Sequence, residues 1–173
     1  EGLEGRTGLA LGLYCPIELA REEIVAARQG HRGPVLRVQR NQRALHRWQL
    51  QLPAHAIYCL PVLHDDNQLR FAPWRPGDAL VTNRFGIPEP DVDPASALPP
   101  EAMSLVVMPL VGFDNNGHRL GMGGGWYDRS LAFRHARAAP PPWLVGAGFA
   151  VQHVDALSSE PWDVPLDAIC TES

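Results

Sequence analysis

Three apolar runs constrain the fold of this chain more strongly than any other feature of its sequence. They cover residues 54–63 (AHAIYCLPVL), 105–111 (LVVMPLV) and 144–151 (LVGAGFAV), with proline, glycine or polar residues around them. Runs of this length without polar alternation are typical of strands covered on both faces, as in a parallel sheet. Helix-forming segments at 18–29, 43–52 and 127–137 alternate with them. The pattern predicts an α/β fold, a single-domain layered sheet that is largely parallel and flanked by helices.

Weaker signals predict four further strands and one loop. The strands are short and cover residues 9–15, 68–72, 78–82 and 166–170. Residues 68–72 alternate polar and apolar side chains, so we expect a more exposed strand there. Pro88 and Pro90 cannot donate backbone hydrogen bonds, which predicts a fixed surface loop over residues 83–100. Because no repeat or long linker occurs, we expect residues 1–173 to form one domain, with an atypical or truncated part at 1–40.

Charge and cysteine content restrict the partners and the location that we expect. The net charge of -4 argues against a general nucleic-acid binder, which normally carries a basic face. No apolar run approaches the roughly 20 residues that cross a bilayer, so we expect no membrane partner. The three cysteines are odd in number and lack CxxC spacing, which favours reduced thiols in the cytoplasm. Cys59 and Cys170 lie in apolar runs, so both are expected in the core.

A glycine-rich stretch follows the second apolar run. Gly121, Gly123, Gly124 and Gly125 stand within five residues, after Arg119 and before Trp126, Tyr127 and Asp128. Glycines let backbone N–H groups turn toward an anion, and a following helix adds a favourable dipole. The stretch lacks the GK[ST] ending of a P-loop, and Trp126 occupies the third glycine position of the dinucleotide fingerprint. Phosphate binding is therefore the favoured hypothesis, and a merely tight turn is the alternative.

The neighbouring residues suggest how such a loop could hold a nucleotide. All 15 basic residues are arginine, so a phosphate-binding cation must be arginine or protonated histidine, and Arg119 is the candidate. Asp128 could bind the Mg²⁺ that accompanies phosphates, or could simply favour the first turn of a helix. Phe85 and Glu89 could stack on and hydrogen-bond a flat heteroaromatic ligand, although Phe85 could instead pack under its own loop. Metal-ligand histidine spacing and a GxSxG elbow are absent, so zinc chemistry and covalent catalysis have no support.

Three ordered segments together resemble one family. They are FGIPEP (85–90), MPLVGFDNNGHRLGMGGGWYDRSL (108–131) and PWDVPLDAICT (161–171), and weaker matches extend the similarity back to residue 43. They are similar to the 5-formyltetrahydrofolate cyclo-ligase family, also called methenyltetrahydrofolate synthetase. The resemblance implies an α/β enzyme that uses ATP and Mg²⁺ to convert 5-formyltetrahydrofolate to 5,10-methenyltetrahydrofolate, with release of ADP and phosphate. Such chemistry needs mainly positioning and charge neutralisation from the protein.

The resemblance also assigns roles to individual residues. The residues implied to bind ATP are Arg119, Leu120, Gly121, Met122, Gly123, Gly124, Gly125, Trp126 and Tyr127. Those implied to bind the folate are Glu18, Phe85, Gly124, Gly125 and Trp126. Arg119, Trp126 and Tyr127 are the implied catalytic residues, and Asp128 and Asp163 match the Mg²⁺ carboxylates. Asp167 is expected to shape the last strand rather than to bind metal.

Departures from the family pattern keep other hypotheses open. The basic helix with which family members usually begin is not matched, residues 19–40 match nothing, and Gly124 stands where a lysine is often found. A second hypothesis is therefore a non-catalytic folate- or nucleotide-binding relative. A third is an unrelated α/β domain in which the glycine stretch is only a turn. Under the first hypothesis we expect a monomer whose partners are the folate and ATP.

Overall fold

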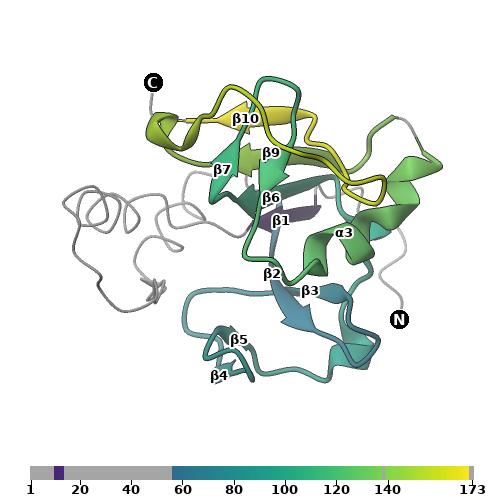
Figure 1. Cartoon of the computed structure of the whole chain (residues 1–173). Coiled ribbons are helices and arrows are strands. Elements are labelled where there is room, and N and C mark those ends of the chain that lie inside the picture. The colour runs from purple at the N-terminus through teal and green to yellow at the C-terminus, as the bar shows by residue number, and fades with distance from the viewer. Residues whose placement is uncertain (1–9, 14–55, 138, 172–173) are drawn as a thin grey trace.

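The computed structural model describes residues 10–13, 56–137 and 139–171, and its largest feature is a six-stranded sheet (Figure 1). In sheet order the strands are β10 (Ala168–Cys170), β9 (Trp143–Ala147), β6 (Leu105–Pro109), β1 (Ala10–Leu13), β2 (Ile57–Leu63) and β3 (Leu69–Pro73). Neighbours from β10 to β2 run parallel, and only β3 pairs antiparallel, with β2. The largely parallel sheet agrees with the predicted α/β class. The helices predicted at 18–29 and 43–52 lie outside the described residues.

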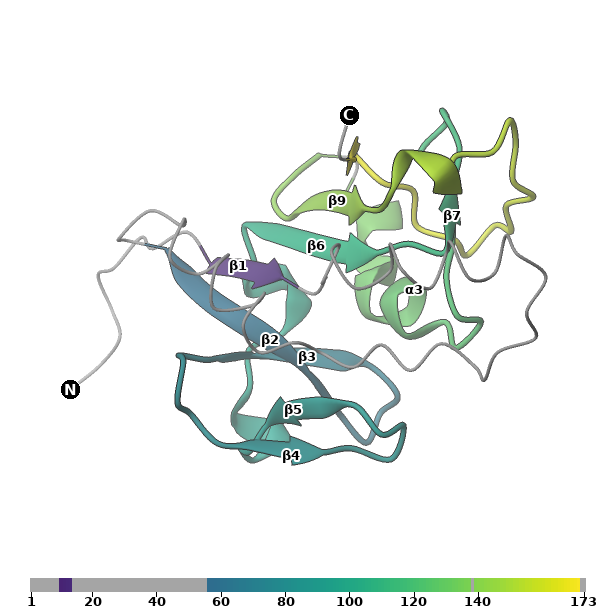
Figure 2. The ribbon, with the colours of Figure 1, turned by 90° about the vertical axis from the view of Figure 1, so that its left-hand side faces the viewer.

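Smaller elements join these strands. Two hairpins form, β4 (Leu80–Thr82) with β5 (Pro88–Pro90) and β7 (Gly112–Phe113) with β8 (Arg119–Leu120). Short 3₁₀ turns cover Pro94–Ser96, Pro100–Ala102, Ala132–His135 and Ala150–Gln152. The α-helix of the described residues is α3 (Trp126–Leu131). Figures 1 and 2 show α3 on one side of the sheet and the β4–β5 hairpin beyond β2 and β3.

Alternate residues of the central strands are buried on opposite faces of the sheet. On β6, Val106 and Met108 are fully buried in a cluster that includes Leu131 of α3. Val107, which lies between them, packs with Tyr58 of β2 on the other face. Successive strand residues point to opposite faces, so a strand covered on both faces needs apolar residues at every position. This confirms a buried strand in each apolar run, but in the third run β9 ends at Ala147 and Ala150–Gln152 form a 3₁₀ turn, so the predicted strand was too long.

The proline-rich segment contains a strand where a loop was predicted. Pro88 and Pro90 belong to β5, which pairs antiparallel with β4. The backbone hydrogen bonds from Asn83 to Ile87 and from Asp91 to Ala79 flank this pairing. Both prolines therefore occupy non-hydrogen-bonded positions, where their lack of an N–H removes no hydrogen bond between the two strands. The prediction treated a missing donor as evidence against any strand.

Other boundaries also differ from the prediction. Strand β3 is more buried than its alternation suggests, because Leu98 bridges to Phe71 through two backbone hydrogen bonds and covers that edge. The helix predicted to reach residue 137 ends at Leu131, and a 3₁₀ turn continues it. Cys59 is in the core as predicted, and burial raises the pKa of its thiol to about 12. Cys170 is exposed on the edge strand β10, so that core assignment was wrong.

A buried carboxylate closes the turn of the β7–β8 hairpin. Asp114 is fully buried, and its Oδ1 accepts hydrogen bonds from the backbone N–H groups of Asn116 and His118. Its Oδ2 accepts a hydrogen bond from the N–H of Leu157 and lies 2.9 Å from Nδ1 of His118. Desolvation alone would raise the pKa of Asp114, but these hydrogen bonds outweigh it and hold the pKa well below its usual range. The turn therefore depends on an ionised aspartate.

This carboxylate should make the fold sensitive to acid. Because the pKa of Asp114 is lower in the folded than in the unfolded chain, its stabilisation is present above the unfolded pKa of about 3.9. It is lost as the pH falls from there toward the folded pKa. We expect the melting temperature to fall steeply below roughly pH 4, and Asp114→Asn to flatten that fall. Circular-dichroism melts from pH 7 to pH 3 measure both, with the exposed Asp155→Asn as control. If melting temperature falls with pH at the same slope in the wild type, Asp114→Asn and Asp155→Asn, the role assigned to Asp114 is contradicted.

Candidate functional site

The glycine loop, residues 121–125, connects β8 to α3 with its backbone open to solvent. Residues 121–124 are exposed, and the Met122 side chain is 79% exposed. Gly123 and Gly125 have φ values of 76° and 61°, in the left-handed region that side chains disfavour. A Cβ on Gly121 or Gly123 would meet no atom within 4 Å. The loop thus has the accessible backbone that the anion-cradle hypothesis requires.

Arg119 does not project into this open loop. Its Nη2 donates to Oδ1 of Asp128 at 2.5 Å, its Nη1 donates to the carbonyl of Val164, and its side chain is only 8% exposed. The guanidinium therefore ties α3 to residues 160–166. The predicted contact between Arg119 and phosphate remains a prediction, and the structure adds a structural role for this residue.

Asp128 and Asp163 come from adjoining segments. Oδ1 of Asp128 also accepts the N–H of Val164 at 3.2 Å, and Asp163 directly precedes Val164. Oδ2 of Asp163 accepts the N–H of Glu160 at 2.8 Å. Within residues 10–13, 56–137 and 139–171, no hydrogen bond engages Asp128 Oδ2 or Asp163 Oδ1. The same residues contain no group of three or more His, Cys, Asp or Glu side chains that could hold a metal ion. Two carboxylates suit Mg²⁺, which takes its remaining ligands from phosphates and water.

Beside the loop lies a group that we call the arginine–aromatic cluster, consisting of Arg84, Phe85, Trp126 and Arg129. The rings of Phe85 and Trp126 meet nearly edge to face, with centroids 5.9 Å apart and planes at 78°. The Cζ atoms of Arg84 and Arg129 each lie 5.3 Å from the Trp126 ring centroid. Phe85 is 55% exposed, so the pair presents a usable aromatic surface. The structure thus brings Phe85 to Trp126 at the end of the glycine loop, and its role in ligand packing stays a prediction.

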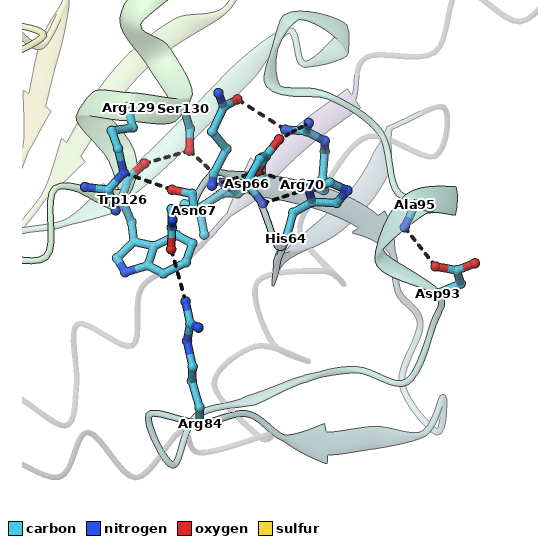
Figure 3. Close-up of polar contacts among 12 residues, drawn as sticks. His64, Asp66, Asn67, Arg70, Arg84, Asp93, Ala95, Trp126, Arg129 and Ser130 are labelled. Carbon is cyan, nitrogen blue, oxygen red and sulfur yellow. Dashed lines mark hydrogen bonds and ion pairs between the residues drawn. The ribbon is translucent and has the colours of Figure 1, made fainter.

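Asn67 joins the two arginines of the cluster. Its backbone carbonyl accepts Nε of Arg129 at 3.0 Å, and its Oδ1 accepts Nη2 of Arg84 at 3.4 Å. Figure 3 shows Arg84 reaching from the hairpin turn toward Asn67 and Trp126. Nearby, Oγ of Ser130 accepts the N–H of Leu69 at 2.7 Å and donates to the Trp126 carbonyl at 2.6 Å. Three segments far apart in sequence, 64–69, 83–87 and 121–130, therefore form one surface.

The remaining predicted residues are placed as follows. Oε2 of Glu89 accepts from Leu63 N and Asn83 Nδ2, so this carboxylate fixes the hairpin. Tyr127 is partly buried against the core. Asp167 accepts the N–H of Leu144 and pairs with Arg134, which confirms that it shapes the last strand. Glu18 lies outside the described residues. Sequence reasoning missed Arg84 and Asn67, since no motif spacing links the three segments.

Comparison with known sequences gives consistent matches. The model of the 5-formyltetrahydrofolate cyclo-ligase family matches residues 36–172. The 5-formyltetrahydrofolate cyclo-ligase of Escherichia coli K12 is 43% identical over 117 residues, 66% of this chain and 62% of that protein. The Haemophilus influenzae protein of the same name is 41% identical over 109 residues, 62% of this chain and 57% of that protein. The aligned part thus spans less than two thirds of these curated relatives.

Two solved structures share the fold. One is a 5,10-methenyltetrahydrofolate synthetase from Mycoplasma pneumoniae, with a TM-score of 0.53 and 22% identity over 96% of this chain and 75% of that one. The other is the Aquifex aeolicus 5,10-methenyltetrahydrofolate synthetase, with a TM-score of 0.59 and 24% identity over 96% of this chain and 70% of that one. Among the described residues, no helix has the length and apolar character to cross a membrane.

Proposed function

The chain belongs to the 5-formyltetrahydrofolate cyclo-ligase family, and we propose that it converts 5-formyltetrahydrofolate and ATP to 5,10-methenyltetrahydrofolate, ADP and phosphate. The formyl oxygen bonds to the γ-phosphorus as the bond from that phosphorus to ADP breaks. N10 then attacks the formyl carbon and gives up its proton to the departing phosphate or to water, and the carbon–oxygen bond breaks so that the oxygen leaves with phosphate. The observation that carries the proposal is the contact of Trp126, at the end of the exposed glycine loop, with Phe85. It supports phosphate and ring binding side by side.

The protein's contribution is positioning. Backbone N–H groups of residues 120–125 would bind the phosphates of ATP, with Trp126 and Tyr127 closing the site. Phe85 and Trp126 would pack on the pterin ring, and Gly124 and Gly125 would leave room for the formyl group. Holding the formyl oxygen near the γ-phosphate replaces a bimolecular encounter by an oriented one. Arg119 would act through Asp128, which it holds at 2.5 Å, as well as through its charge.

Magnesium fits the two carboxylates described above. Asp128 and Asp163 would each offer the oxygen that no hydrogen bond engages within the described residues. The ion would neutralise phosphate oxygens as charge develops on them. The Arg119–Asp128 bridge would keep the Asp128 carboxylate in place before the ligands arrive.

A second candidate function is a non-catalytic relative that binds folate or nucleotide. One observation favours it: the Arg119 guanidinium already donates to Asp128 and Val164, so the predicted phosphate cation is engaged within the fold. Arg119 could then neutralise transition-state charge only by exchanging partners, which would leave that role to Mg²⁺ or to Arg84 and Arg129 beside the loop.

Turnover and binding measurements separate the two functions. Formation of 5,10-methenyltetrahydrofolate is followed by its near-ultraviolet absorbance, with ATP and Mg²⁺ present and with each omitted. Calorimetry measures ATP and folate binding in parallel. We expect turnover that requires both ATP and Mg²⁺. Binding of ATP or folate without turnover would support the non-catalytic relative, and binding of neither ligand would exclude both functions.

We further propose that residues 1–173 form one layered domain that acts as a cytoplasmic monomer without nucleic-acid or membrane partners. The net charge of -4 and the free thiols of Cys59 and Cys170 support this proposal. Light scattering coupled to size exclusion would reveal a dimer if the monomer assignment is wrong.

A further inference from the structure

We propose that Arg84 and Arg129 bind a carboxylate of the glutamate tail of the folate, beside the aromatic surface that holds its rings. This inference rests on the proposed function, because it assigns a tail subsite to the same ligand. The two side chains come from the β4–β5 turn and from α3, and both lie against the Trp126 indole. The subsite is therefore continuous with the arginine–aromatic cluster.

The charges of these two arginines are uncompensated in the described part of the chain. Arg70, Arg119 and Arg134 each pair with an aspartate, at distances of 2.7, 2.5 and 2.8 Å. Arg84 and Arg129 pair with no carboxylate among the described residues, yet the fold holds both against one ring. Contact with an aromatic ring orients a guanidinium but does not cancel its positive charge. The arrangement therefore points to an anionic ligand.

The donors available to such an anion are numerous. A guanidinium has five N–H donors in a planar fork that matches a carboxylate. In the described structure Arg129 uses only Nε, toward the Asn67 carbonyl, which leaves both of its terminal nitrogens available. Arg84 uses Nη2 in a long bond of 3.4 Å to Asn67 Oδ1, and both arginines are exposed. Asn67 thus orients the guanidinium groups of Arg84 and Arg129 without neutralising their charge (Figure 3).

The position of the arginines favours a carboxylate of the folate over a phosphate of ATP. Phe85 and Trp126 offer an aromatic surface, and Arg84 also lies 5.2 Å from the Phe85 ring. A ligand that fits this surface is flat and aromatic, with its negative charge at one end. The folate has this form, because a ring system is joined through an aminobenzoyl group to glutamate. Nη1 of Arg129 also lies against Gly125 of the glycine loop, where a Cβ would be 2.8 Å from it, so the ATP titration below tests phosphate as the alternative anion.

The test measures equilibrium binding, which does not require turnover. Calorimetry compares 5-formyltetrahydrofolate with its diamide, in which both glutamate carboxyl groups are neutral carboxamides, and with ATP. We expect Arg84→Gln and Arg129→Gln each to weaken folate binding about fivefold, and the double variant about twentyfold. Affinity for the diamide and for ATP should change less than twofold. Arg75→Gln, an exposed arginine away from the cluster, is the matched control and should change none of these affinities.

Other results would overturn the proposal. Equal weakening of folate and diamide would mean that the arginines only hold the hairpin against α3. Weakening of ATP instead would identify the bound anion as phosphate. A wild-type protein that binds folate and diamide equally well would show that the tail is not held. If the arginine variants lose folate binding selectively but the wild-type protein shows no turnover, only the proposed catalysis is contradicted. If the wild-type protein turns over its substrate but the variants show no selective loss of folate binding, only this inference is contradicted.

Discussion

Asp128→Asn should lower the turnover of 5-formyltetrahydrofolate at least a hundredfold, a magnitude typical of losing one group that stabilises transition-state charge. The substitution removes the negative charge that faces Arg119 at 2.5 Å and the oxygen proposed for Mg²⁺. It also leaves a guanidinium that is only 8% exposed without its carboxylate partner, which should cost about 2 kcal/mol of stability. Initial rates over a Mg²⁺ titration, together with thermal melts, separate the loss of activity from the loss of stability.

The chain provides a closely matched control for this prediction. Asp167 pairs with Arg134 at 2.8 Å and accepts the backbone N–H of Leu144, as Asp128 does with Arg119 and Val164. The side-chain exposures of the two pairs are also similar, 7% and 19% against 8% and 22%. Asp167→Asn should therefore cost comparable stability while turnover in the folded protein persists. If both variants keep their activity, or both lose it in parallel with stability, Asp128 has only a structural role.

The strands were the most predictable part of this molecule. On β6, burial on both faces requires apolar residues at consecutive positions, so the composition of residues 105–109 already specifies its environment. The same holds for β2. The glycine-rich stretch predicted an open, turned loop, because glycine readily adopts the left-handed backbone that Gly123 and Gly125 have. In these places one local physical requirement determines the residue type.

The features that could not be predicted depend on contacts between distant segments. Nothing local to β3 shows that Leu98 covers Phe71, and the alternation of residues 68–72 therefore suggested exposure. Arg119 was assigned to phosphate from its place before the glycines, but its partner Val164 is 45 residues away in sequence. The bond from Arg129 to Asn67 spans 62 residues. Such pairings follow from how the sheet and hairpins dock, which residue spacing does not encode.

Gly117→Ala should destabilise the fold by roughly 3 kcal/mol, equivalent to a fall in melting temperature of about 10 °C. Gly117 has a φ of 81°, and a Cβ there would lie 2.7 Å from the backbone carbonyl oxygen of Leu166. A backbone atom cannot rotate away as a side chain can. The clash would also strain the hydrogen bond from Leu166 N to the Gly117 carbonyl, which is 2.9 Å long. Chemical denaturation with thermal melts measures the change.

Gly77→Ala isolates the contribution of the clash. Gly77 has a φ of 99°, and a Cβ there would meet no atom within 4 Å, so this variant carries only the backbone strain of about 1–2 kcal/mol. The difference between the variants measures how firmly residues 160–166 are held against the β7–β8 turn. Because Val164 in that segment contacts Arg119 and Asp128, Gly117→Ala should also reduce turnover in protein that remains folded. Equal destabilisation by both substitutions would show that the segment can move away from the turn, and the proposed support for the Asp128 carboxylate would then fail.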